Sequence, residues 1–309
     1  MSEQTTRHSA YERQRSETRR NELVDLIARH IPQDGAVKPI EDLYLFRVSS
    51  PGDPLHSVYK PSLCVVVQGS KEFFLNDERY VYDPHHYLLV TAELPLVGQV
   101  LEASNEEPYL SLLLNFDPTL VGSVIAEVGD ITPQNDVDAR AINVGALDAD
   151  LLDAVLRLVK LLDTPTEAPF LAPMITKEII YRLWMGDQRD RLLHIVSSDG
   201  NTPLIGKAIE MINEDYSQQL RVEELASDLG MSVSGFHHHF KAVTAMSPLQ
   251  YQKRLRLQEA RRLLLGGELN ATDVAFRVGY NDSSHFSREY KGLFGLPPKR
   301  DIDRLLAAA

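Results

Sequence analysis

The sequence of 309 residues has a single cysteine and no long apolar run. Cys64 has no partner for an internal disulfide, and one thiol cannot build a cysteine-based zinc site. No segment approaches the roughly 18 apolar residues that span a bilayer, and the polar N-terminus lacks the apolar region of a signal peptide. These absences predict a cytoplasmic protein without a membrane partner.

Charge is distributed unevenly along the chain. The net charge is −12, which by itself disfavours nucleic acid as a partner because phosphates attract cations. Residues 201–309 hold 14 Lys and Arg against 13 Asp and Glu, whereas residues 1–200 hold 18 against 31. One short segment, with Glu259 as its only acid, is a predicted basic patch: Lys241, Lys253, Arg254, Arg256, Arg261 and Arg262. The last third of the chain is therefore compatible with DNA.

The first part of the chain is predicted to be a β-rich domain preceded by a helix. Residues 1–17 are polar without an apolar period, which predicts a disordered tail. The following "NELVDLIARHI" has apolar residues at helical spacing, and Pro32 ends this helix. Between Leu43 and Phe116, seven short apolar runs alternate with turn signals. This texture is typical of a small antiparallel barrel or double-sheet roll.

Two amphipathic helices are predicted after the β-rich region. "DADLLDAVLRLVKLLD" has a broad apolar face, and "APMITKEIIYRLWMG" is expected to have Pro173 in its first turn and Gly186 after its end. They pack on the barrel or against the same helices of a second copy, which leaves a homodimer open. "SSDGNTP" is the predicted linker. We therefore expect a tail at 1–17, a first domain at 18–196, a linker at 197–203 and a second domain at 204–309.

The last hundred residues contain an internal repeat. "VEELASDLG" at 222–230 matches "ATDVAFRVG" at 271–279, and each is followed by a polar turn and a helix with aromatic residues four apart. Gly230 and Gly279 permit a positive φ at the turns. The repeat predicts two helix-turn-helix units, at about 222–243 and about 271–294. A helix from Pro248 to about Leu265, roughly 25 Å long, would space them about one DNA turn apart.

The residues of both domains resemble a known family. The segment 205–304, with "DVAFRVGYNDSSHFSREYKGLFGLPPKR", resembles the DNA-binding domain of AraC/XylS transcriptional regulators. "YKPSLCVVVQGSKEFFL" and "YLSLLLNFDPTLV" are similar to a cupin-like regulatory domain in one branch of that family. The resemblance implies an α+β multidomain fold: a cupin-like antiparallel β-barrel with flanking helices, for effector binding and dimerisation, then an all-α domain with two helix-turn-helix units.

The resemblance also implies a function. The expected protein is a sequence-specific regulator, an activator like most relatives, that binds double-stranded promoter DNA through both helix-turn-helix units. A small-molecule or reactive effector at the barrel would control it, and RNA polymerase would be a further partner. No cofactor is expected.

Three consecutive histidines in "SVSGFHHHF" need an explanation. On this helix Val233, Phe236, Phe240 and Val243 are predicted to face the core, and consecutive residues do not converge on one metal ion. A histidine pH switch stays open. The resemblance instead assigns base-reading positions in both units: Ser234, His237, His238, Ser283, Ser284, His285, Ser287 and Arg288.

Arg288 is the strongest candidate for a guanine contact because its guanidinium can donate two hydrogen bonds to that base. Phosphate contacts are expected from Lys241, Lys253, Arg254 and Lys299. The alternative for any of these side chains is an ordinary solvated surface group.

Enzymatic function is disfavoured. His85 and His86 would point to opposite faces of a strand, and no further histidine follows before His194, so no metal site is expected. This argues against a cupin-type metal-dependent enzyme fused to a DNA-binding module. A DNA-repair methyltransferase would need a "PCHR" motif, which is absent. Cys64 is interpreted as a small core residue or, alternatively, as an effector-sensing thiol, which would require a lowered pKa.

Overall fold

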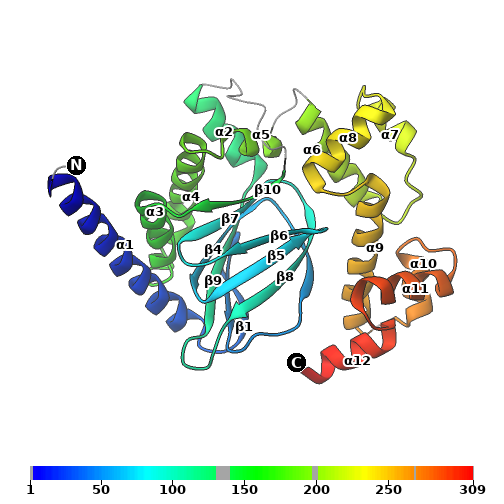
Figure 1. The fold of residues 1–309 in the computed structure, drawn as a ribbon, viewed down its shortest axis with the longest axis horizontal. Coiled ribbons are helices and arrows are strands. Elements are labelled where there is room, and N and C mark those ends of the chain that lie inside the picture. The colour runs from blue at the N-terminus through cyan, green and yellow to red at the C-terminus, as the bar shows by residue number, and fades with distance from the viewer. Residues whose placement is uncertain (1–2, 130–139, 197–200, 268, 309) are drawn as a thin grey trace.

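The computed structural model describes residues 3–129, 140–196, 201–267 and 269–308. A two-sheet β unit with helices on one side is followed by a group of C-terminal helices (Figure 1). The predicted α+β fold is therefore confirmed. Within these residues no helix combines the length and apolar character needed to cross a bilayer.

Two antiparallel sheets form the β unit, which we call the barrel. One sheet has the strand order β1-β2-β9-β4-β7-β10, and the other has the order β3-β8-β5-β6. The seven predicted runs are all strands. β1, β3 and β10 were not predicted. β1 is almost entirely exposed and β3 has no buried residue, so their sequences lack a clear apolar pattern. The bounds are Gly35–Ile40 (β1), Leu43–Val48 (β2), Leu55–Tyr59 (β3), Ser62–Gln68 (β4), Ser70–Leu75 (β5), Glu78–Tyr82 (β6), His86–Val90 (β7), Leu94–Glu102 (β8), Tyr109–Asn115 (β9) and Ile142–Ala146 (β10).

Strand β4 separates two hydrophobic cores because successive side chains point to opposite faces of a sheet. Leu63 and Val65 pack with the N-terminal helices. Cys64 and Val66 pack on the other face, in a cluster that includes residues of the second sheet. The space between the two sheets of the barrel and the helix-covered face of the larger sheet therefore belong to separate hydrophobic cores.

The disordered tail predicted for residues 1–17 is wrong for the residues described, because helix α1 runs from Glu3 to His30. The first 31 residues contain no Gly or Pro and are rich in Glu, Gln and Arg, so helix propensity sustains the helix where no apolar period exists. Its second half is anchored: Leu23 and Ile27 are fully buried, and Arg19 forms an ion pair of 2.5 Å with Asp153.

Four further helices complete the first domain: α2 (Pro118–Val128), α3 (Ala149–Lys160), α4 (Ala168–Met185) and α5 (Arg189–Val196). The placement of Pro173 in a first turn is wrong. α4 begins earlier, with Pro169 in its first turn and Pro173 inside the helix. Gly186 does end α4, as predicted. α2 and α5 were not predicted.

The C-terminal domain contains seven helices within the described residues: α6 (Asn201–Glu214), α7 (Val222–Asp228), α8 (Val233–Thr244), α9 (Pro248–Leu265), α10 (Ala271–Arg277), α11 (Ser283–Phe294) and α12 (Pro298–Ala308). The α7–α8 and α10–α11 pairs lie where the repeat predicted them. Of the linker predicted at 197–203, residues 197–200 lie outside the described part and 201–203 belong to α6.

The two domains are in contact along α9. The Tyr251 hydroxyl donates a hydrogen bond of 2.8 Å to the carbonyl oxygen of Glu93, and Arg254 donates to Asn76 Oδ1 at 3.1 Å. Buried residues of the barrel, α6 and α8 form one continuous cluster, including Phe236. The first helix-turn-helix unit therefore shares its core with the barrel.

Candidate nucleic-acid interface

The turns of the two units have the backbone geometry that the glycines predicted. Gly230 has φ 67° and Gly279 has φ 89°. Ala226 and Ala275 are fully buried where the paired helices cross. The local sequence therefore sets the helix crossing in both units.

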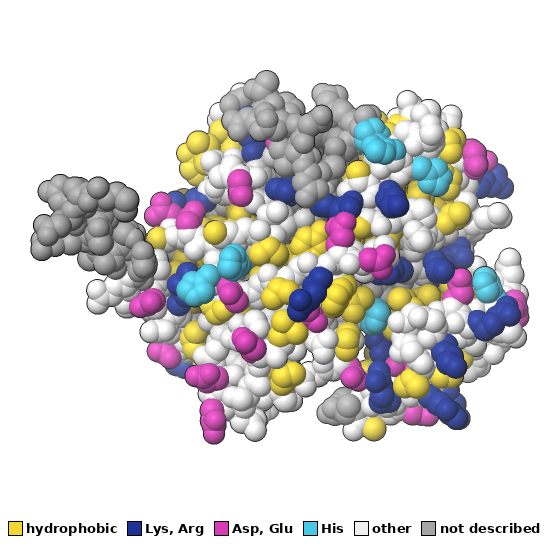
Figure 2. Space-filling view, viewed as in Figure 1, with side chains coloured by type: hydrophobic (Ala, Val, Ile, Leu, Met, Phe, Trp, Pro, Cys, Tyr) yellow, Lys and Arg dark blue, Asp and Glu magenta, His cyan; other side chains and the backbone are white. Residues whose placement is uncertain are grey.

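Helix α8 presents a polar face to solvent. Its N-terminus is capped by Ser232, whose hydroxyl accepts a hydrogen bond from the Gly235 amide, and Phe236 and Phe240 are fully buried. Figure 2 shows histidine side chains on the surface over this helix. The exposed residues are Ser234, His238 and Lys241, whereas His237 and His239 are half-buried.

One detail of the α8 prediction is wrong: Val233 keeps 38% of its surface exposed and is not a core residue. It is the first residue of the helix, where the chain enters from the turn and no neighbouring helix covers it. Val243 is buried as predicted.

Helix α11 repeats this arrangement. Asp282 caps it by accepting hydrogen bonds from the amides of Ser284 and His285, and these bonds hold the pKa of its carboxyl below the usual value. Phe286 and Tyr290 are fully buried. Ser284, His285 and Arg288 are exposed, and Ser283 and Ser287 are half-buried.

The side chain of His285 is engaged on its own helix. Its Nε2 lies 3.6 Å from Glu289 Oε1, and its ring contacts the Tyr280 ring edge-on. It is therefore less available to a base than its exposure alone indicates.

Helices α8 and α11 can be aligned residue by residue through their buried aromatic pairs. Each residue of α8 then corresponds to the residue of α11 whose number is higher by 50. His238 corresponds to Arg288, and Ser234 corresponds to Ser284. The same offset pairs Lys241 with Lys291, which is exposed in the last turn of α11. Lys291 was not among the predicted contacts, although the repeat places it at the position equivalent to Lys241.

The predicted basic patch is largely structural. Arg261 forms a buried bidentate ion pair with Asp301, at 2.8 and 3.0 Å. Arg256 donates to the carbonyl oxygens of Tyr216, Gln218 and Gly279. Each of these guanidiniums satisfies buried or tightly packed acceptors and is not available to a phosphate.

The predicted phosphate contacts have different surroundings. Arg254 donates to Asn76 of the barrel, so we do not propose it as a phosphate contact. Lys253 is exposed but lies 3.3 Å from Glu289. Lys241 and Lys299 are exposed and form no ion pair with the described residues. Basic side chains gather over the C-terminal helices in Figure 2, in contrast to the acidic first domain.

The first domain holds the end of α8. Arg140 donates to the carbonyl oxygen of Lys241 at 2.7 Å and also to that of Ala242, and it is paired with Glu78 of β6. The amide of Ala141 donates to Val243 at 3.2 Å. The last carbonyls of a helix have no partners within it, so these bonds fix the orientation of α8 relative to the barrel.

The sandwich interior contains the candidate sensing residues. Cys64 is 3% exposed, and burial raises its thiol pKa to about 11. Burial lowers the pKa of Lys71 to about 8, and its ammonium lies 3.4 Å from the Tyr59 hydroxyl and 4.6 Å from the centre of the Phe73 ring. The buried Tyr109 hydroxyl lies beside the side chains of Ser111 and Tyr82. The surroundings of Cys64 do not favour a thiolate.

The histidines of the first domain have different surroundings. His86 Nδ1 lies 2.8 Å from Asp83, whereas His85 is exposed. His194 is half-buried, with its Nδ1 3.2 Å from the Thr91 hydroxyl, and desolvation lowers its pKa to about 4. Across the described part of the chain no three His, Cys, Asp or Glu side chains gather as metal ligands.

A β-barrel joined to two equivalent helix-turn-helix units with exposed polar faces defines the class of DNA-binding regulators. Comparison with known families agrees. Residues 39–191 match the AraC-type transcriptional regulator N-terminus, and residues 225–304 match a helix-turn-helix domain. The two matches cover more than half of the chain, which therefore belongs to the AraC-type transcriptional regulators.

The curated relatives include the HTH-type transcriptional activator RhaS. The chain is 33% identical to RhaS of Klebsiella pneumoniae (strain 342) over 102 residues, which are 33% of this chain and 36% of RhaS. It is 25% identical to RhaS of Escherichia coli O1:K1 / APEC over 178 residues, which are 58% of this chain and 63% of RhaS. The chain thus spans less than two thirds of the length of either relative.

Solved structures share the fold. ToxT from Vibrio cholerae superimposes with a TM-score of 0.56 at 11% identity, over 84% of this chain and 96% of ToxT. A ToxT structure with bound unsaturated fatty acid gives a TM-score of 0.54 at the same identity, over 84% and 93%. The arrangement of both domains therefore occurs in a solved protein.

Proposed function

We propose that this protein is a transcriptional activator that reads two adjacent major-groove segments of promoter DNA. The observation that carries the proposal is the pair of equivalent exposed faces, with His238 on α8 and Arg288 on α11. Helix α9 has 18 residues and is about 27 Å long, which suits units spaced near one DNA turn. Such a regulator acts where the promoter lies, in the cytoplasm, with RNA polymerase as its partner.

Base contacts are proposed for both units. Ser234, Ser284, His238 and Arg288 are exposed on the outward faces, and we assign the strongest readout to the last two. We assign weaker base contacts to four residues that are half-buried or engaged on their own helix: His237, Ser283, His285 and Ser287. Lys241, Lys291 and Lys299 are the proposed phosphate contacts.

The effector is proposed to bind in the barrel. Lys71 places an ammonium among aromatic and hydroxyl groups, and Tyr109 adds a buried hydroxyl. Such groups inside an apolar interior orient small ligands. Cys64 borders this cluster as a packing residue or as a reactive thiol.

A homodimer is proposed through α4. One side of this helix packs on the first domain with Ile179, Ile180 and Leu183 buried. The other side carries a stripe of exposed apolar residues, which we call the α4 stripe: Phe170, Met174, Tyr181 and Met185. Exposed apolar side chains gathered along one side of a helix are typical of a protein interface. Here Lys177 and Glu178 lie between Met174 and Tyr181 in the sequence of the helix.

The test is selection of bound DNA from a random library by the wild-type protein and by His238→Ala and Arg288→Ala. We expect a long site in which each variant relaxes preference in a different half, by about 1–3 kcal/mol per base contact. Arg29→Ala, an exposed arginine on α1, is the control and should leave the selected site unchanged. Salt-sensitive binding without a preferred sequence would contradict the proposal.

A further inference from the structure

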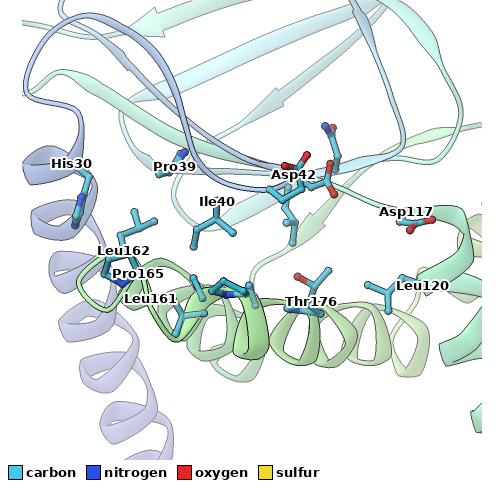
Figure 3. A pocket seen from close by; sticks show the side chains of 17 residues that line it. His30, Pro39, Ile40, Asp42, Asp117, Leu120, Leu161, Leu162, Pro165 and Thr176 are labelled. Atoms are coloured by element: carbon cyan, nitrogen blue, oxygen red, sulfur yellow. The ribbon is translucent and has the colours of Figure 1, made fainter.

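A cavity of about 590 Å³ lies outside the barrel, between the six-stranded sheet and helix α4 (Figure 3). The turn between β1 and β2 forms one wall, and the first turns of α4 form the opposite wall. The end of β9, the start of α2 and the end of α3 close the sides. The cavity is on the helix-covered face of the sheet, away from Cys64. Its volume suits a small organic ligand.

The sequence of α4 leaves this space open. The residues of α4 that face the sheet here are Ala168, Ala172 and Thr176, spaced four apart on one side of the helix. Their short side chains do not reach the β1–β2 turn, whereas larger residues later in α4, such as Ile179 and Leu183, are buried. The remaining walls are mainly Leu, Ile and Pro side chains.

Two polar groups at this cavity lack a hydrogen-bond partner among the described residues. The Thr176 hydroxyl belongs to a residue that is only 9% exposed and makes no hydrogen bond with the described residues. On the opposite wall, the half-buried Asp42 carboxylate likewise accepts no hydrogen bond from the described part of the chain, although Lys38 is near enough to interact with it electrostatically. Figure 3 shows the two on facing sides of the space. A buried polar group without a partner is costly, so a ligand that satisfies it gains binding energy.

The charged side chains that line the cavity are mainly acidic. Three carboxylates line the cavity: Glu41, Asp42 and Asp117. Glu41 is paired with Lys38, and Asp117 caps α2. The one basic residue of the lining, His30, lies with its Nε2 2.9 Å from Asp163. A cleft that concentrates negative charge within apolar walls favours a cation.

We propose that this cavity binds an organic amine with an apolar body, its ammonium group donating to the Asp42 carboxylate and the Thr176 hydroxyl. The site goes beyond the proposed DNA-binding function and does not depend on it. Because the occupant would contact the face of α4 opposite the α4 stripe, it would stabilise the helix that we propose for dimerisation.

The experiment is calorimetric titration of the full chain with three probes of the same shape: 4-phenylbutylamine, 4-phenylbutanol and 4-phenylbutyrate. We expect the amine to bind about tenfold or more tightly than the alcohol, and the acid to bind weakest. Asp42→Asn should remove most of the advantage of the amine. Asparagine tolerates the φ of 63° at this position, so this variant keeps the turn. Thr176→Val, nearly the same shape, should weaken the amine less.

Two further variants separate the outcomes. Ala172→Leu fills the cavity and should abolish binding of every probe, with thermal melting used to show that the chain still folds. Glu106→Gln, an exposed acid in the β8–β9 loop, is the charge control and should change nothing. Equal binding of all three probes, an unchanged amine affinity in Asp42→Asn, or no binding of the amine to the wild-type chain would overturn the proposal.

Discussion

Gly230 and Gly279 occupy equivalent places in the two helix-turn-helix units but have different surroundings. A Cβ at Gly230 would meet no atom within 4 Å, whereas one at Gly279 would lie 2.0 Å from the carbonyl oxygen of Ser217. The loop after α6 thus packs directly against the second turn, and Arg256 bridges the same two places. The second glycine is required for close approach as well as for its positive φ.

Substituting each glycine by alanine is expected to separate these two effects. Gly230→Ala should lower the free energy of unfolding by about 1–2 kcal/mol, the cost of a positive φ for a residue with a Cβ. Gly279→Ala should cost more, about 3 kcal/mol or above, because the backbone must also move. Urea denaturation monitored by circular dichroism measures both. Equal losses would show that the α6–α7 loop does not pack on the second turn as described.

At the scale of elements, β3 meets α11 through His56. Its ring contacts the Phe294 ring edge-on at 4.7 Å, and its Nδ1 has no hydrogen-bond partner among the described residues. Burial lowers its pKa to about 4, with smaller effects in the same direction from Arg261 and Arg254 and an opposing effect from Asp301. This contact therefore requires neutral histidine.

Acid is expected to weaken the protein through this contact. The folded-state pKa of His56, about 4, lies below the ordinary value of 6.5. The unfolded chain therefore binds the proton first, and stability falls as the pH drops from 6.5 toward 4. His56→Leu should reduce this slope by up to about 1.4 kcal/mol per pH unit. His194, whose pKa is also lowered to about 4, continues to contribute to the pH dependence of stability in this variant. The control is His85→Leu, a substitution of an exposed histidine. Identical slopes in all three proteins would contradict the assignment.

At the scale of the whole molecule, the barrel and the first helix-turn-helix unit behave as one packed body. They share a hydrophobic cluster, and Arg140 joins β6 to the end of α8. The second unit depends on α9, which also contacts β3 and β8. A change in the barrel therefore has a direct structural path to α8, through side-chain contacts between the two domains.

The dimer is the prediction at this scale. Met174→Glu places a charge in the middle of the α4 stripe and is expected to weaken self-association by about tenfold or more, because the charge must be desolvated in the interface. Sedimentation equilibrium over a range of concentrations measures it. Leu306→Glu, an equally exposed apolar position on α12, is the control. A wild-type chain that stays monomeric at all concentrations would contradict the proposed interface.

The sequence by itself determined the features that depend on local pattern. The β-strand alternation, the glycine turns, the α9 boundaries and the repeated aromatic pairs were all predictable, because each follows from spacing within a few residues. The buried positions of Phe236 and Phe240 followed from the same spacing. The helical N-terminus was the exception, since its propensity was not accompanied by an apolar period.

Only the tertiary structure decided which basic side chains are free to contact DNA and where a cavity forms. Arg254, Arg256 and Arg261 resemble DNA contacts in the sequence, yet each has a partner that is distant along the chain or on another element. The burial of Cys64 and the cavity beside α4 likewise depend on which elements pack together. Ion pairs and cavities form between residues that are distant along the chain. The sequence pattern shows which side chains are present, but not which of them come into contact after folding.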